Sequence, residues 1–168
     1  LSDASSVWVG MRGAGVFKFA KGKNQSLKLD ESYPAEWATN TFLINKKQEV
    51  IAGTKNGLFK LKKGKYESLS NNTEQHNWNV KVLRQGHRGE YLIGTHGHGL
   101  VIADSLLKSA YALKIPDGLA DYVSTIDEVS DGEWMVGTNR GIYLLRLNNK
   151  GVYSVTKTIS WLVTQVGT

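Results

Sequence analysis

The stretch that decides the fold reads Trp-Met-Val-Gly-Thr-Asn-Arg-Gly-Ile-Tyr at residues 134–143. Three earlier stretches share its pattern, in which an apolar run and a first glycine precede a short polar turn, a second glycine and another apolar run. The first glycines are Gly10, Gly53, Gly94 and Gly137, at intervals of 43, 41 and 43 residues. A chain of 168 residues therefore holds about four periods, which is the mark of a repeat protein.

Each copy has the pattern of a tight β-hairpin. Its apolar runs are rich in β-branched and aromatic residues, and a short glycine-containing turn joins them. Glycine at both ends of the turn is explained either by positive φ or by another strand that packs too close for a Cβ atom. Copies one and three hold an extra glycine, at Gly13 and Gly97.

The rest of the period adds two more strands. In the first period, residues 26–29 alternate as a half-buried third strand should, residues 30–36 form a polar connection, and an apolar run follows at 37–44. We therefore predict an all-β chain, a β-propeller of about four four-stranded antiparallel blades. The blades form either a complete small ring or part of a larger propeller. One domain covers residues 1–168, with repeats near 7–49, 50–90, 91–133 and 134–168.

Composition fits an ordinary globular domain, with 40% hydrophobic and 21% charged residues and no cysteine. No stretch approaches the ~18 apolar residues of a membrane span. The N-terminus lacks the regions of a signal peptide, so an export signal would lie outside this chain. The net charge of +6 comes largely from lysines that follow the second strand of a repeat. We expect these lysines on solvated hairpins, without nucleic-acid binding, while a preference for anionic partners stays open.

The fourth period resembles a known repeat. Gly-Leu-Ala-Asp-Tyr-Val at 118–123, followed by Asp-Gly-Glu-Trp-Met-Val-Gly-Thr-Asn-Arg-Gly-Ile at 131–142, is similar to the two-component-regulator propeller repeat. The resemblance extends to all four periods and is loosest in the second. It implies an extracytoplasmic sensing region of a bacterial hybrid two-component or related signalling protein, periplasmic or extracellular and typically seven-bladed. With four repeats and no kinase or DNA-binding part, the chain resembles an excised sensor portion.

The phase of the repeats bears on assembly. The chain begins at the second strand of a blade and ends with an apolar run at 161–166 that matches first strands. This last run could pair with residues 7–9 and close a ring. The alternatives are pairing with a second chain and membership of a larger propeller, because exposed strand edges would aggregate.

A ligand site is expected on the face that carries the signature turns and the connections between blades. Aromatic platforms beside amide, imidazole and guanidinium donors suit a sugar or another polar or anionic ligand. The alternative for each tryptophan is a core wedge between blades. The candidate ligand-binding residues are Arg12, Lys55, Asn56, His96, His98, Asn139, Arg140, Trp37, Trp78 and Tyr122. Tyr33 and Trp161 are expected at the mouths of inner strands on the same face.

Nothing in the sequence indicates catalysis or a cofactor. His96 and His98 are close enough to share a metal, but a zinc site needs three or four ligands and no others have suitable spacing. We therefore expect no metal there and no cofactor. The favoured function is a non-catalytic sensor that binds an oligosaccharide or other polar ligand. One alternative is a propeller lyase related to streptogramin lyases, with His96 or His98 as the catalytic residue; another is a protein-interaction scaffold.

Overall fold

The computed structural model describes residues 5–11, 14–23, 26–34, 38–69, 78–114 and 121–160. No helix in this part of the chain is long and apolar enough to span a membrane. All of its named elements are strands, which confirms the prediction of an all-β chain. In chain order they are β1 (Ser6–Met11), β2 (Gly15–Lys21), β3 (Leu27–Pro34), β4 (Thr39–Ile44), β5 (Val50–Thr54), β6 (Gly57–Lys62), β7 (Lys65–Ser68), β8 (Asn79–Gln85), β9 (Tyr91–His96), β10 (Leu100–Ala103), β11 (Ala110–Ala112), β12 (Val123–Ser130), β13 (Glu133–Thr138), β14 (Gly141–Leu147) and β15 (Tyr153–Ser160).

The strands form four antiparallel sheets, each made of strands that follow one another in the chain. The first sheet has three described strands in the order β1-β2-β3. The other three have four each, in the orders β4-β5-β6-β7, β8-β9-β10-β11 and β12-β13-β14-β15. The first sheet thus begins at the strand that carries Gly10, as the phase of the repeats predicts.

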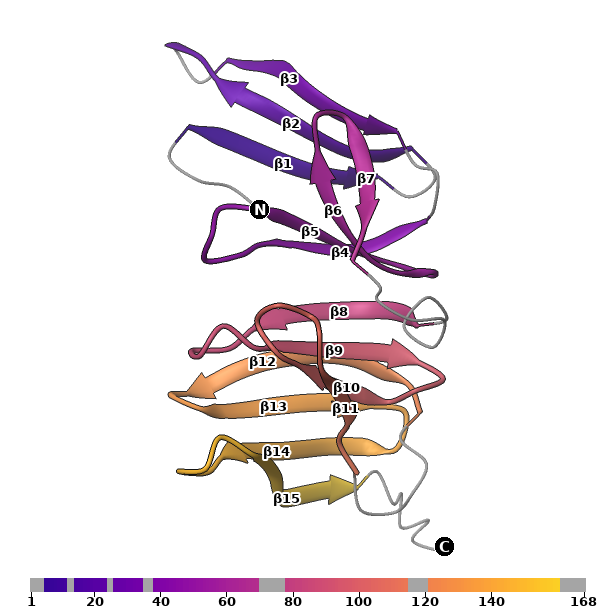
Figure 1. Cartoon of the computed structure of the whole chain (residues 1–168), viewed down its shortest axis with the longest axis vertical. Helices are drawn as coiled ribbons and strands as arrows, with labels where there is room; N and C mark the ends of the chain where they lie inside the picture. The colour runs from indigo at the N-terminus through magenta and orange to yellow at the C-terminus, as the bar shows by residue number, and fades with distance from the viewer. Residues whose placement is uncertain are drawn as a thin grey trace, which may run out of the picture.

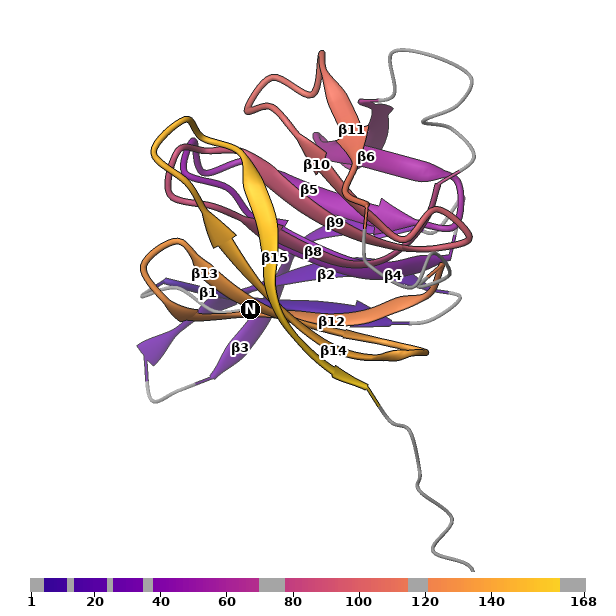
Figure 2. The same ribbon diagram turned by 90° about the horizontal axis from the view of Figure 1, so that it is seen from below.

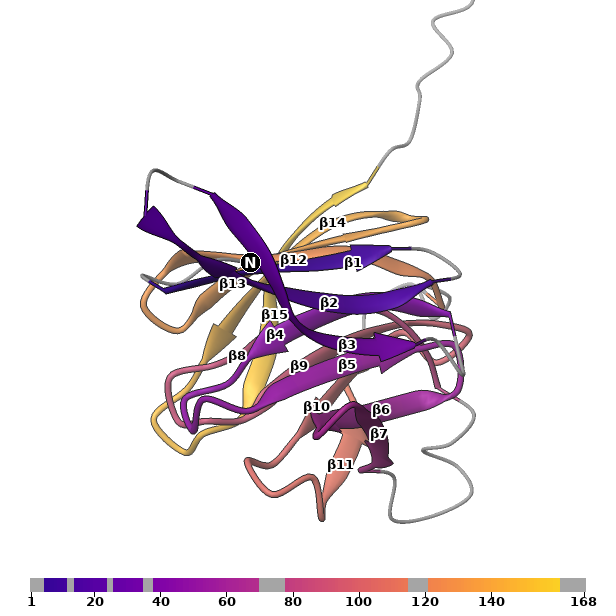
Figure 3. The same ribbon diagram turned by 90° about the horizontal axis from the view of Figure 1, so that it is seen from above.

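The sheets stack in chain order along the long axis of the molecule (Figure 1). The first strands of successive sheets pack together, since β4 contacts β8 and β8 contacts β12. Seen along the stack, the outer hairpins β6–β7 and β10–β11 lie on the same side of the molecule (Figures 2 and 3). Each sheet therefore has an inner strand and an outer strand.

Three hydrophobic clusters fill the spaces between neighbouring sheets. The first two sheets enclose Trp8, Val16 and Ala52 with their neighbours. Successive side chains of β9 point in opposite directions and belong to the next two clusters. Ile93 packs toward the second sheet and Leu92 toward the fourth. Every residue of β9 except the last is buried, so both faces of this strand are covered by neighbouring sheets.

Each of the two glycines in the signature has its own physical reason. A Cβ atom on Gly94 would lie 2.4 Å from Val82 Cγ1 and 2.7 Å from Val123 Cγ1, on the inner strands of its own sheet and of the next. A Cβ on Gly53 or Gly137 would also meet an inner-strand side chain, at 2.5 and 2.7 Å. The second glycines instead have positive φ, with values of 109°, 99°, 64° and 148° at Gly15, Gly57, Gly99 and Gly141. Both explanations offered by the sequence are therefore correct, one for each glycine.

The threonine after the first glycine closes the turn. Thr95 Oγ1 donates to the carbonyl of Gly99 at 2.8 Å and accepts the amide of His98 at 3.0 Å. Thr54 and Thr138 make the same pair of hydrogen bonds in the second and fourth sheets. Because Thr54 and Thr95 are fully buried, their hydroxyl groups must find hydrogen-bond partners within the protein, and the turn backbone provides them.

The first period departs from the sequence interpretation. Residues 26–29 were expected to be half-buried, but Leu27 and Leu29 are 54% and 52% exposed. Strand β3 also continues to Pro34, through much of the expected polar connection. Pairing with β2 explains the extension, since the ladder runs from Lys21↔Leu27 to Gly15↔Pro34. Alternation in the sequence correctly indicated a strand here but overestimated the burial of this outer edge.

Candidate functional site

The signature turns and the starts of the inner strands lie at one end of the sheets. In the register of the fourth sheet, Val123 at the start of β12 pairs with Thr138 at the end of β13. Asn79 pairs with His96 in the third sheet, and Thr39 with Thr54 in the second. The three described signature turns and the strand starts therefore share a face, as expected from the sequence. We call this end of the sheets the turn face.

Backbone hydrogen bonds attach each turn to the sheet that follows it. The amide of Gly57 donates to the carbonyl of Trp78 at 2.8 Å. One period later, the amides of Gly97 and Gly99 donate to the carbonyl of Asp121 at 2.7 and 3.2 Å. The turn face is thus built from consecutive sheets that are held together at the backbone, which favours a preformed surface.

One group of candidate residues is brought together at the seam between the third and fourth sheets. His96 bridges to Tyr122 through the backbone, and their rings meet edge to face with centroids 5.1 Å apart. Asn139 donates through its backbone amide to the carbonyl of Tyr122 at 3.1 Å and through its side chain to Asp121 Oδ1 at 3.0 Å. His96, Asn139 and Asp121 are exposed, and Tyr122 is half-buried. This seam therefore offers an aromatic ring, an imidazole, an amide and a carboxylate to one ligand.

The remaining candidates are not part of this seam. Lys55, His98 and Arg140 are exposed on the turn face, and Asn56 is half-buried beside Lys55. Trp78 is only 7% exposed and packs in the core between the second and third sheets, as the core-wedge alternative had it. Tyr33 is 2% exposed, and its ring packs on Trp8. The expected site residues Arg12, Trp37 and Trp161 lie outside the described residues.

Asp121 was missed in the sequence analysis. It ends a polar connection of the kind expected on this face, and that position was the available signal. Its role as a bridge between two turns depends on the register of the third sheet against the fourth, which the sequence does not show. With Lys55 and Arg140, the exposed charges of the turn face include both signs.

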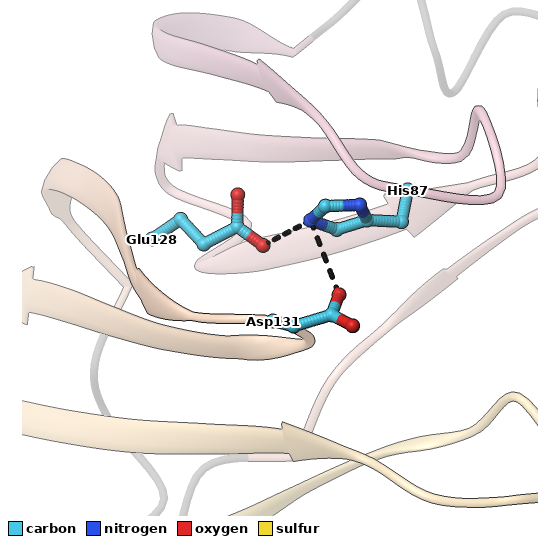
Figure 4. Close-up of side chains that lie close together, drawn as sticks. All are labelled: His87, Glu128 and Asp131. Carbon is cyan, nitrogen blue, oxygen red and sulfur yellow. Dashed lines mark hydrogen bonds and ion pairs between the residues drawn. The ribbon is translucent and has the colours of Figure 1, made fainter.

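A second polar cluster lies at the opposite end of the sheets (Figure 4). His87 Nε2 lies 2.6 Å from Glu128 Oε1 and 3.4 Å from Asp131 Oδ1, and one ligand atom from each residue falls within 4.8 Å of the others. Three side chains could act as ligands in this cluster, whereas a structural zinc site has four. The side chain of Asp131 is also 90% exposed. We therefore describe the cluster as a hydrogen-bonded polar link between the third and fourth sheets.

Comparisons with known proteins address the fold. No protein-family model matches the sequence, and no curated protein matches it. Among solved structures, the chain is similar to the extracellular domain of BT3049 from B. thetaiotaomicron, which is assigned to a hybrid two-component system. The TM-score is 0.68, with 18% identity over 95% of this chain and 22% of that one.

A second extracellular domain, that of BT4673 from the same organism and likewise assigned to a hybrid two-component system, gives a TM-score of 0.66 with 18% identity. That match covers 92% of this chain and 21% of BT4673. Virginiamycin B lyase from Staphylococcus aureus gives 0.63 with 16% identity, over 94% of this chain and 53% of the lyase. The fold is a β-propeller. The four sheets are its blades, and the chain spans about a fifth of the length of the two extracellular domains.

Proposed function

We propose that this chain is a non-catalytic, ligand-sensing portion of an extracytoplasmic propeller in a bacterial signalling protein. The observation that carries the proposal is the preformed seam between the third and fourth blades, where His96, Tyr122 and Asn139 converge. Similarity of fold to two extracellular domains of signalling systems supports it. The location is then periplasmic or extracellular, and further blades or a second chain complete the propeller.

The ligand we propose is an oligosaccharide or another polar or anionic molecule. Aromatic rings stack on sugar faces, and the amide and imidazole donate to hydroxyl groups. Lys55 and Arg140, exposed on the same face, add positive charge for a carboxylate or sulfate. Asp121 accepts from Asn139, which orients the amide of that side chain.

Binding to a glycan array that includes anionic oligosaccharides, followed by calorimetry, tests this proposal. Arg140→Ala should weaken binding by about 1–3 kcal/mol, the usual cost of losing a charge-assisted hydrogen bond. The fold should persist, because Arg140 is exposed on its turn. Lys47→Ala is the matched control, since Lys47 is an exposed cation at the other end of the sheets. An affinity that depends on Lys47 and not on Arg140 would move the site to that other end.

The second candidate is a lyase, because virginiamycin B lyase shares the fold. His96 and His98 are exposed on the turn face and would be the candidate catalytic residues. Incubation of the purified chain with a streptogramin B substrate distinguishes the two. Cleavage that disappears in both His96→Ala and His98→Ala would replace the sensor proposal. A protein-interaction scaffold would instead retain a partner protein and no glycan.

A further inference from the structure

A hollow in the outer part of the seam between the third and fourth blades opens at the end opposite the turn face. Its volume is about 220 Å³. The third blade supplies its charged walls from two turns, and the fourth blade supplies a strand start. The lining residues that matter are Arg88, Glu90, Asp104, Tyr111, Gly151 and Tyr153.

The carboxylate of Glu90 is only partly satisfied. Its Oε1 accepts a hydrogen bond of 2.7 Å from the hydroxyl of Tyr153, across the blade seam. Its Oε2 is buried and has no hydrogen-bond partner. Burying a carboxylate oxygen without a donor is costly, so the approach of a cation to this carboxylate would be favourable. Gly86 makes the room, because a Cβ there would lie 2.5 Å from the Glu90 carboxylate.

The repeats provide an internal comparison for Glu90. Glu49 and Glu133 also stand four residues before the first glycine of their copies. Each is neutralised within its blade, Glu49 by Lys60 and Glu133 by Arg146. A glutamate at this turn is thus ordinarily paired with a cation on the third strand.

The third blade lacks that cation. Counted from the second glycine of each copy, Lys60 and Arg146 correspond to Ile102 and Asp104. Ile102 is apolar, and Asp104 is a second carboxylate whose oxygens accept backbone amides of its own turn at 2.7–3.2 Å. Glu90 therefore faces the hollow without the partner that its two counterparts have.

Arg88, a cation on the wall of the hollow, does not replace the missing partner of Glu90. Its guanidinium lies over Gly151 of the fourth blade, where a Cβ would be 2.1 Å from Arg88 Nη1. Among the described residues Arg88 forms no ion pair, with Glu90 or with any other group. The hollow thus presents a carboxylate and a guanidinium that form no ion pair among the described residues, with the 45% exposed ring of Tyr111 beside them.

We propose that this hollow binds a free amino acid, whose ammonium group pairs with the carboxylate of Glu90 and whose carboxylate is held by Arg88. An ammonium group restores the cation that the third blade lacks, and a guanidinium is well suited to a carboxylate. The volume of about 220 Å³ lies below the range of about 300–1,000 Å³ for sites of drug-sized ligands. A single amino acid, with its side chain against Tyr111, is the size of ligand that this space admits. The site is separate from the turn face.

Calorimetry and thermal melting of the purified chain with each of the common amino acids test this inference. We expect saturable binding and a raised melting temperature with at least one of them. The N-acetyl and the methyl ester forms of that amino acid should bind more weakly by about tenfold or more, because each lacks one charged group. Glu90→Gln and Arg88→Ala should weaken the free amino acid to a similar degree.

Glu133→Gln is the matched control, since it removes the equivalent glutamate from the fourth blade. It should leave amino-acid binding unchanged, as should Arg140→Ala on the turn face. Without ligand, Glu90→Gln should melt at or above the temperature of the parent chain, because it removes an unpaired buried charge. If no amino acid binds at about 10 mM, the proposal is overturned, because this concentration detects any site with a Kd of about 1 mM or lower. Equal binding of the N-acetyl form, or by Glu90→Gln, would overturn it too.

Discussion

At the scale of single residues, the signature turn depends on two small residues, a glycine and a threonine, with different functions. The first glycine allows an inner strand to approach, and the threonine that follows it binds the turn backbone. At Gly94 the neighbours are valines from two blades, so the space is closed on both sides. At Gly10 a Cβ would instead lie 3.0 Å from the ring of Phe42.

Gly94→Ala should therefore destabilise the chain more than Gly10→Ala. Overpacking of a filled core costs about 1–3 kcal/mol, and β-branched neighbours have little freedom to move away. Phe42 is half-buried and can rotate, so the cost at Gly10 should be smaller. Urea unfolding of the two variants measures the difference. Equal losses would show that close packing is not what requires glycine at position 94.

Thr95→Val should be destabilising although it preserves shape. It leaves the amide of His98 without its partner, while the carbonyl of Gly99 keeps the backbone amide of Thr95 at 2.9 Å, and the loss of a hydrogen-bond partner from such a group costs about 1–3 kcal/mol. Thr158→Val is the control, since Thr158 is exposed on β15. We expect it to change the free energy of unfolding by less than about 0.5 kcal/mol. Similar values for both variants would contradict the role of the hydroxyl group.

At the scale of elements, the β2–β3 hairpin has an ionisable cluster on its paired strands. Lys18 Nζ lies 2.9 Å from Asp30 and 3.0 Å from Glu31, and Tyr33 donates to Glu31. Hydrogen bonds to Asp30 and Glu31 raise the pKa of Lys18. Burial, with the hydrogen bond to Glu31, raises the pKa of Tyr33 to about 12.

This cluster predicts a loss of stability in alkali. A group whose pKa is raised on folding contributes stability that is complete below its unfolded pKa, 10.0 for tyrosine, and is lost as the pH rises through the folded value. Lys18 acts in the same sense, and Glu31 stays ionised throughout this range. The urea midpoint should therefore fall between about pH 10 and 12, and Tyr33→Phe should reduce the fall. Tyr111→Phe, at an exposed position, should leave the fall unchanged. If the urea midpoint falls equally in both variants, Tyr33 is excluded as a cause.

At the scale of the whole molecule, stability should be unevenly distributed over the blades. The third blade packs against a blade on each side, and β9 belongs to two of the three hydrophobic clusters. The last described strand, β15, is largely exposed. Opening of local segments follows such differences in buried contacts.

Amide hydrogen exchange should accordingly be slowest in β9 and β10 and faster in β3 and β15. Peptide-level mass spectrometry over minutes to hours measures this. Uniform exchange in all four blades would indicate that the chain opens only as a whole. Added amino acid should further slow exchange in the strands around Glu90, if that site is occupied.

The sequence alone determined the fold class, because its decisive features are local. A glycine interval of 41–43 residues and the alternation of apolar runs specify strands, turns and their order without knowledge of the packing. The turn face also followed from the chain, since antiparallel order by itself brings signature turns and strand starts to one end. The candidates Lys55, Asn56, His98 and Arg140 were found in this way, and their part in binding stays a prediction.

Tertiary structure decided what depends on contacts between blades. Asp121 joins the site because its carbonyl meets a turn of the preceding blade, and Trp78 is withdrawn from the surface because two sheets close over it. Glu90 resembles Glu49 and Glu133 in sequence, yet only the packed seam shows that its Oε2 is buried without a donor. Strand order repeats with the sequence, whereas burial and pairing at a seam depend on side chains from residues far apart in the chain, such as Glu90 and Tyr153, which are 63 positions apart.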